Sequence, residues 1–149
     1  MGQAGFGRGD SDRGLGRSLT LADGKAAYRN RFVKTPYYEK DLDILSAMAD
    51  PVASPANTHI FRHAGRILCL WEAGLPTLVT PDLETLGTCD FDGKLRGAMT
   101  AHPHVDPRTG EMLFFGYVPF LQYHRVSATG ELLQTVPVPV QKPTMMHDF

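Results

Sequence analysis

The feature that most constrains this chain is the texture of residues 20–149, where short apolar or alternating runs are separated by turn residues. Such runs are typical of β-strands, in which successive side chains point to opposite faces of a sheet. The pattern therefore predicts an all-β fold. The strands are expected over 26–33, 56–61, 66–72, 77–79, 97–101, 111–117, 121–126 and 131–136.

Two segments depart from the strand texture. Within 41–49 apolar residues such as Leu45 and Met48 recur three and four positions apart, which is the spacing of a short helix, and its end is expected before Pro51. Residues 1–19 are rich in Gly, Arg, Asp and Ser and have almost nothing to bury, so we expect a disordered Gly/Arg-rich tail there. The ordered domain is accordingly predicted to span 20–149.

An internal echo refines the architecture. Thr-Gly-Glu occurs at 109–111 and again at 129–131, and the glycine in each copy suits the positive φ of a tight hairpin turn. A hairpin every twenty residues gives four strands in about forty, close to the ~40–50-residue period of a propeller blade, although a plain antiparallel meander would produce the same echo. About 130 ordered residues make roughly three blades, whereas closed propellers have 4–8. We therefore expect a partial β-propeller and a fragment of a longer protein.

Composition excludes several classes of partner. The formal net charge is −1, so a nucleic-acid binder, which needs excess Lys and Arg, is not favoured. Two cysteines are too few for a disulfide framework, and the N-terminus has no apolar run that could serve as a signal peptide. We therefore predict a cytoplasmic location, with no protein partner implied. Peripheral contact with a membrane stays open, because it needs only a local apolar patch.

Histidines are the candidate site residues. His102 and His104 flank Pro103, and residues two apart on a strand share a face. His147 follows an apolar run near the end of the chain. Spacing alone leaves two readings open: a shared metal site for His102 and His147, or satisfied structural histidines, with the second as the default. Metal ligation by the pair at 59 and 63 is not favoured, and His124 is expected at the surface or at a sheet edge.

Four motifs resemble, in order, those of the carotenoid cleavage oxygenases, a family that includes lignostilbene dioxygenases. They are Ala-Asn-Thr-His-Ile-Phe-Arg-His-Ala-Gly-Arg-Ile-Leu-Cys-Leu-Trp-Glu-Ala-Gly-Leu-Pro at 56–76, Leu-Glu-Thr-Leu-Gly at 83–87, Arg-Gly-Ala-Met-Thr-Ala-His-Pro-His-Val-Asp-Pro at 96–107 and Met-Met-His-Asp-Phe at 145–149. The resemblance implies a seven-bladed propeller with iron(II) on its axis, bound by four histidines.

The resemblance also implies roles for particular residues. His102 matches the first iron ligand and His147 the second, which makes His104 a neighbour, and the other two ligands lie beyond the last residue of this sequence. Glu72 matches a glutamate that accepts a hydrogen bond from a ligating histidine, here His147. Its neighbour Trp71 stands where the stilbene-cleaving branch has a lysine, which weakly favours a polyene substrate and a place in the substrate pocket.

The expected function is that of a fragment of a non-haem iron(II) dioxygenase. With O2, the whole protein would cleave a conjugated C=C bond of an apolar carotenoid or apocarotenoid and give two carbonyl products. The isolated chain is expected to be inactive, because it carries half of the ligands. Two alternatives stay open: a lignostilbene-type dioxygenase, and a non-catalytic β-sheet interaction module or pseudogene product.

Overall fold

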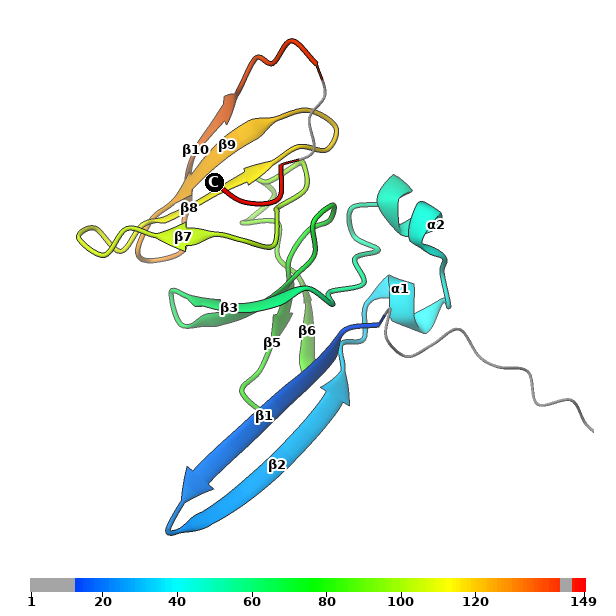
Figure 1. Ribbon diagram of the computed structural model, residues 1–149, viewed down its shortest axis with the longest axis vertical. Helices are drawn as coiled ribbons and strands as arrows, with labels where there is room; N and C mark the ends of the chain where they lie inside the picture. Colours follow the sequence, from blue (N-terminus) through cyan, green and yellow to red (C-terminus); the bar gives the residue numbers. More distant parts are fainter. Residues whose placement is uncertain (1–12, 143–145) are drawn as a thin grey trace, which may run out of the picture.

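Two four-stranded antiparallel sheets form the body of the protein in the computed structural model, which describes residues 13–142 and 146–149 (Figure 1). In each sheet the strands follow one another in chain order as a meander. The predicted all-β class is confirmed, while the count of roughly three blades stays a prediction. The first sheet contains β3 (His59–His63), β4 (Arg66–Leu70), β5 (Thr77–Val79) and β6 (Thr85–Thr88), and the second β7 (His104–Val105), β8 (Met112–Gly116), β9 (Gln122–Val126) and β10 (Leu132–Pro137).

A separate hairpin of β1 (Leu15–Ala22) and β2 (Lys25–Phe32) projects away from the two sheets (Figure 1). Asp23 and Gly24 form its turn, both with positive φ, as a two-residue hairpin connection requires. Residues 1–12 lie outside the described part of the chain. The expected boundary of the tail at residue 19 is wrong, because β1 begins at Leu15 and pairs with β2 along its whole length.

Two short helices, α1 (Pro36–Glu39) and α2 (Ile44–Ala49), connect the hairpin to the first sheet. The side chain of Asp43 caps α2 by accepting a backbone hydrogen bond, and the helix ends before Pro51 as expected. The apolar spacing that predicted α2 does not mark a buried face, however. Ala47 is its buried residue, whereas Leu45 is 74% exposed.

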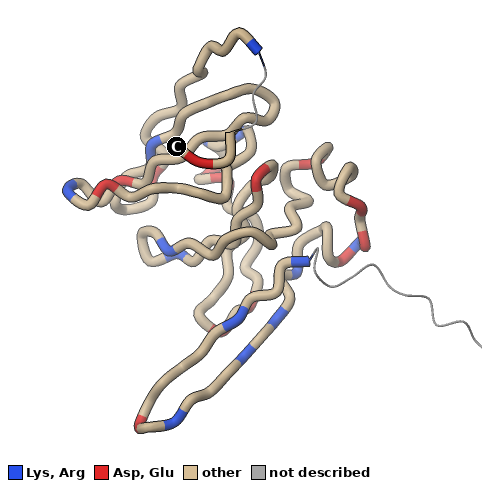
Figure 2. Tube along the Cα trace, in the orientation of Figure 1, with Lys and Arg blue, Asp and Glu red and all other residues tan. Residues whose placement is uncertain are grey.

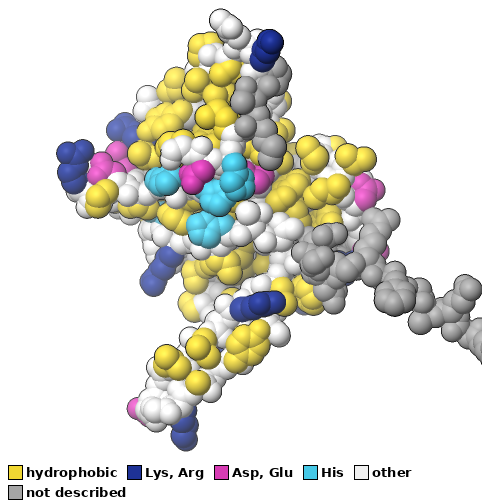
Figure 3. Space-filling view, in the orientation of Figure 1, with side chains coloured by type: hydrophobic (Ala, Val, Ile, Leu, Met, Phe, Trp, Pro, Cys, Tyr) yellow, Lys and Arg dark blue, Asp and Glu magenta, His cyan; other side chains and the backbone are white. Residues whose placement is uncertain are grey.

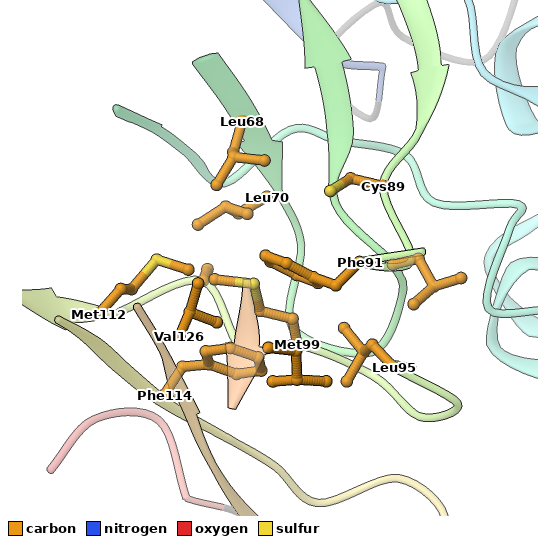
Figure 4. Packing of buried hydrophobic residues seen from close by; sticks show 12 residues of the cluster. Leu68, Leu70, Cys89, Phe91, Leu95, Met99, Met112, Phe114 and Val126 are labelled. Carbon is orange, nitrogen blue, oxygen red and sulfur yellow. The ribbon is translucent and has the colours of Figure 1, made fainter. Parts of the chain in front are cut away.

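The core lies between the two sheets and joins them (Figure 4). The side chains of β4 meet those of β8 and β9, and residues of the connection between the sheets fill the space between them. Full burial of a large apolar side chain contributes about 1.5–3 kcal/mol, so this cluster holds the sheets in one arrangement. Charged residues lie mainly toward the outside, on turns and on the hairpin (Figure 2). The cluster comprises Leu68, Leu70, Leu75, Cys89, Phe91, Leu95, Met99, Ala101, Met112, Phe114, Val126 and Leu132.

The apolar segment 97–101 is not the strand that its sequence predicted. It crosses from one sheet to the other and forms only an isolated bridge between Gly74 and Met99. Met99 N–H donates to the Gly74 carbonyl and Thr100 N–H to the Phe115 carbonyl, each at 3.0 Å. The segment is apolar because both sheets cover it, and its backbone bonds to both of them. We call residues 97–101 the interior linker.

The repeated Thr-Gly-Glu turns behave as predicted. Gly110 joins β7 to β8 with φ of 70°, and Gly130 joins β9 to β10 with φ of 90°. The sequence pattern missed β6 and β7, since β6 contains Gly87 and polar residues and β7 is only two residues long. Among the described residues, no helix has both the length and the apolar character needed to cross a membrane.

Candidate metal centre

Three separate parts of the chain supply the candidate site. Glu72 lies two residues after β4, in the turn that leads toward β5. His102 follows the interior linker and precedes β7. His147 belongs to the segment Met146–Phe149, which lies beside the second sheet (Figure 1). The core positions the first two, because the turn after β4 and the interior linker are bonded to each other through Gly74 and Met99.

The three side chains converge on one another. One potential ligand atom from each of Glu72, His102 and His147 lies within 4.8 Å of the other two. Glu72 Oε1 is 3.5 Å from His102 Nε2 and 3.5 Å from His147 Nδ1, and the centroids of the two imidazole rings are 4.4 Å apart. Figure 3 shows histidine side chains gathered in the middle of one face of the molecule, with acidic side chains beside them.

The donor atoms at this site suit a divalent metal ion. His102 Nε2 and Glu72 Oε1 are buried and have no hydrogen-bond partner among the described residues. Their mutual distance of 3.5 Å is longer than an ordinary hydrogen bond, and unsatisfied buried polar atoms are costly. Imidazole nitrogen and carboxylate oxygen are ordinary ligands and hydrogen-bond partners at metal sites. The exposure of the side chains rises across the site, from 16% for Glu72 to 30% for His102 and 64% for His147.

An apolar pocket of about 760 Å³ adjoins the site. Trp71 and Glu72 line one side, and the loop that follows β8 lines another. Tyr117, in that loop, donates a hydrogen bond of 3.4 Å to Glu72 Oε2. Both the carboxylate and Trp71 therefore face a space large enough for an extended apolar molecule.

His104 lies outside the three-residue cluster and contacts the segment that carries His147. Its Nε2 is 2.9 Å from Asp148 Oδ1. The hydrogen bond with His104 is the main reason that the pKa of the Asp148 carboxyl lies below its ordinary value. Phe149 packs edge-on against His104 and Phe115, with ring centroids 4.9 Å and 5.3 Å apart. These contacts attach the segment to the second sheet.

Sequence reasoning missed two neighbours of the site. His59 Nδ1–H donates to the Ala101 carbonyl at 2.6 Å, and its ring stacks on His102 with centroids 5.9 Å apart. Tyr117 is the other. His59 begins β3 and His104 begins β7, about one blade period apart, and this repeat is a signal that could have pointed to His59. Tyr117 follows an apolar strand and has no distinguishing pattern.

The expectation for His124 was wrong, because this side chain is 1% exposed. Its strand β9 is an inner strand between β8 and β10. The ring stacks on Phe114, with centroids 4.7 Å apart, and Nδ1 lies 3.0 Å from the Thr135 hydroxyl. Burial lowers the pKa of His124 to about 4, so the ring is neutral at pH 7.

The fold and the site together define an all-β protein with a histidine–carboxylate cluster where two meander sheets and the last described segment meet. The model of one protein family, the retinal pigment epithelial membrane protein family, matches residues 12–149. The chain belongs to this family, and the resemblance to carotenoid cleavage oxygenases is confirmed.

Similar proteins agree with this assignment. A carotenoid cleavage oxygenase of Mycobacterium tuberculosis is 39% identical over 88% of this chain, and a carotenoid 9,10(9',10')-cleavage dioxygenase 1 of Arabidopsis thaliana is 33% identical over 98%. The crystal structure of a Pseudomonas brassicacearum lignostilbene dioxygenase superposes with a TM-score of 0.79 at 30% identity, covering 92% of this chain and 33% of that protein. The two curated relatives are covered over 28% and 34% of their own length, so this chain spans about a third of such proteins.

Proposed function

We propose that this chain is part of a non-haem iron(II) dioxygenase that cleaves a conjugated C=C bond of a carotenoid or apocarotenoid. The observation that carries the proposal is the convergence of Glu72, His102 and His147 within 4.8 Å. Three segments far apart in the sequence meet there, and two buried atoms of the cluster have no hydrogen-bond partner among the described residues. Membership in a family whose relatives are named carotenoid cleavage oxygenases supports the choice of reaction.

The proposed roles follow from the contacts. His102 would bind the iron through Nε2, the buried atom without a partner. His147 would bind it through Nε2, since its Nδ1 faces Glu72 Oε1. Glu72 would accept the Nδ1–H hydrogen bond, which fixes the tautomer and orientation of the ring. When bound, iron(II) held by neutral imidazoles supplies the open coordination positions and the redox chemistry with O2.

The remaining work of the protein belongs to its own side chains. The apolar pocket beside Glu72 suits a conjugated hydrocarbon. We propose that Trp71 contacts the substrate there, offering an indole face to a polyene.

We further propose that the described sheets are part of a seven-bladed propeller, of which residues 20–149 form roughly three blades, with iron on its axis. Two more histidine ligands would come from the rest of the protein. The 149-residue chain alone would then be inactive. We also propose a cytoplasmic location, with peripheral membrane contact as an option.

A stilbene-cleaving dioxygenase is the second candidate, supported by the likeness to the lignostilbene dioxygenase of P. brassicacearum. Against it stands Trp71, because an indole offers one weak donor where a phenolic substrate favours a cation. A panel containing both apocarotenals and hydroxystilbenes separates the two candidates, since each predicts turnover of one class only.

The test uses protein expressed from the complete reading frame. Iron content and cleavage of the panel are measured for the unaltered protein and for His102→Ala and His147→Ala. We expect about one iron per chain in the unaltered protein and loss of iron and turnover in both variants. His63→Gln is the matched control, because His63 bonds the Ser127 carbonyl away from the cluster. Full iron retention in both alanine variants would falsify the proposal.

A further inference from the structure

The two oxygens of the Glu72 carboxylate have different surroundings. Oε1 faces His102 Nε2 and His147 Nδ1, each at 3.5 Å. Oε2 instead accepts the hydrogen bond from the Tyr117 hydroxyl at 3.4 Å. One oxygen is thus turned toward the histidines, while the other accepts a hydrogen bond from a phenol in the loop after β8.

The fold brings Tyr117 to this place for a local reason. Tyr117 directly follows β8, whose last residue, Gly116, lies against the interior linker. A Cβ at Gly116 would be 2.0 Å from the Ala98 carbonyl oxygen, so no other residue allows this approach. Because the linker also leads into His102, Tyr117 and His102 are held in register through the same contact.

The surroundings of Tyr117 keep its phenol protonated, so that the hydroxyl can act as a hydrogen-bond donor. The side chain is partly buried in the wall of the apolar pocket, together with Trp71 and Glu72. Burial, and then the negative charge of Glu72, raise the pKa of the Tyr117 phenol above its ordinary value. The phenol is therefore protonated at neutral pH and can donate to the carboxylate.

We propose that Tyr117 is a positioning residue of the metal centre: its hydroxyl holds the Glu72 carboxylate in the rotation that presents Oε1 to His147. A carboxylate with one free oxygen can rotate about its last torsion and lose the contact with imidazole Nδ1–H. Tyr117 would act through Glu72, to which its hydroxyl donates. This inference rests on the proposed function, since it assigns a residue to the same metal site.

The test measures the affinity of the complete protein for Co²⁺, an air-stable substitute for iron(II), by competition with a chelator. The variants are Tyr117→Phe, Glu72→Ala and the double variant, because alanine removes the acceptor entirely. Tyr123→Phe is the matched control, because it removes the same hydroxyl from a tyrosine of β9 that lies opposite Val136 of β10. Urea unfolding of each variant checks the fold.

We expect Tyr117→Phe to weaken Co²⁺ binding about three- to tenfold, below the roughly 10- to 100-fold cost of removing a direct partner of a ligand. In the Glu72→Ala background the same change should have no further effect, which a merely structural role of Tyr117 would not produce. If Tyr117→Phe and the unaltered protein bind Co²⁺ with equal affinity, or if the effects of the two substitutions on Co²⁺ affinity are fully additive, the role of Tyr117 is overturned while the proposed function stands. Absence of Co²⁺ binding by the unaltered protein overturns the proposed function with it.

Discussion

At the scale of single residues, the site depends on which hydrogen bonds accompany the histidines. Glu72→Gln keeps the size of the side chain but removes the charge that faces His147 Nδ1. We expect iron retention in the complete protein to fall at least about tenfold, the usual cost of losing a carboxylate partner of a ligating histidine. Glu84→Gln is the control, because Glu84 pairs with Arg31 on the surface. Unchanged iron content after chelator dialysis would refute the role of Glu72.

A second prediction at this scale concerns pH. The folded protein keeps His124 neutral down to about pH 4, whereas the unfolded chain takes up a proton near the ordinary pKa of 6.5. The stability associated with the neutral ring is therefore complete above pH 6.5 and is lost as the pH falls toward 4. The loss is up to about 1.4 kcal/mol per pH unit in that window.

Urea unfolding between pH 4 and 7.5 measures this dependence, and His124→Gln supplies the comparison. We expect the variant to be less stable at pH 7, because it loses the stacking on Phe114, but to show a shallower decline below pH 6.5. An identical slope in both proteins would show that another group causes the decline.

Residue patterns predicted part of the site. The resemblance of the motifs pointed to Glu72, His102 and His147, and the structure brings these three together. The spacing of the histidines alone left a structural role as the default, because contacts between segments 30 to 75 positions apart depend on tertiary packing. For the same reason, no local pattern pointed to Tyr117 or to the burial of His124.

At the scale of elements, the contact of β8 with the interior linker positions one proposed ligand. Gly116→Ala would place a Cβ 2.0 Å from the Ala98 carbonyl oxygen, which belongs to backbone and cannot move aside cheaply. We expect a loss of about 1–3 kcal/mol in the free energy of unfolding, the range for overpacking a tight interior. Because the linker leads into His102, metal affinity should fall as well.

The control is Gly16→Ala in β1, whose new Cβ would lie 3.3 Å from the flexible Leu83 side chain. Its unfolding free energy should change by much less than that of Gly116→Ala. If calorimetry or urea titration finds the two variants equally stable, the linker is not held by this close approach.

Elements were predictable where periodicity and turn chemistry coincided. The strand over 77–79 matches β5 residue for residue, and β8, β9 and β10 lie within one or two residues of their expected bounds. The prediction of a strand over the interior linker was wrong, because complete burial produces an apolar run whatever the backbone conformation. The strand expected over 26–33 matches β2 to within one residue, whereas β1 was missed and begins inside the expected tail, since it has few buried residues and thus no clear apolar pattern.

At the scale of the whole molecule, many large apolar side chains are exposed to solvent, and half of them lie on the projecting hairpin or on edge strands of the sheets. For a family in which this chain spans about a third of its relatives, we expect further chain to cover them. The examples are Leu19, Leu21, Tyr28 and Leu86, all more than 60% exposed.

We therefore predict that the isolated 149-residue chain is poorly soluble, binds an apolar fluorescent dye and neither retains iron stoichiometrically nor cleaves an apocarotenal. The complete protein, measured side by side, should bind less dye per residue and retain iron. A soluble, iron-loaded and active 149-residue chain would contradict this prediction and, with it, the requirement for ligands from elsewhere.

The exposed segment that carries His147 also determines how the cluster of Glu72, His102 and His147 would open in this chain. Glu72 and His102 belong to the packed body, whereas Met146–Phe149 is attached to it by the surface pair of His104 with Asp148 and by the Phe149 ring. Detaching four residues costs far less than separating the two sheets. In the 149-residue chain, His147 should therefore leave the cluster by local opening of this segment, while Glu72 and His102 stay in place in the packed body.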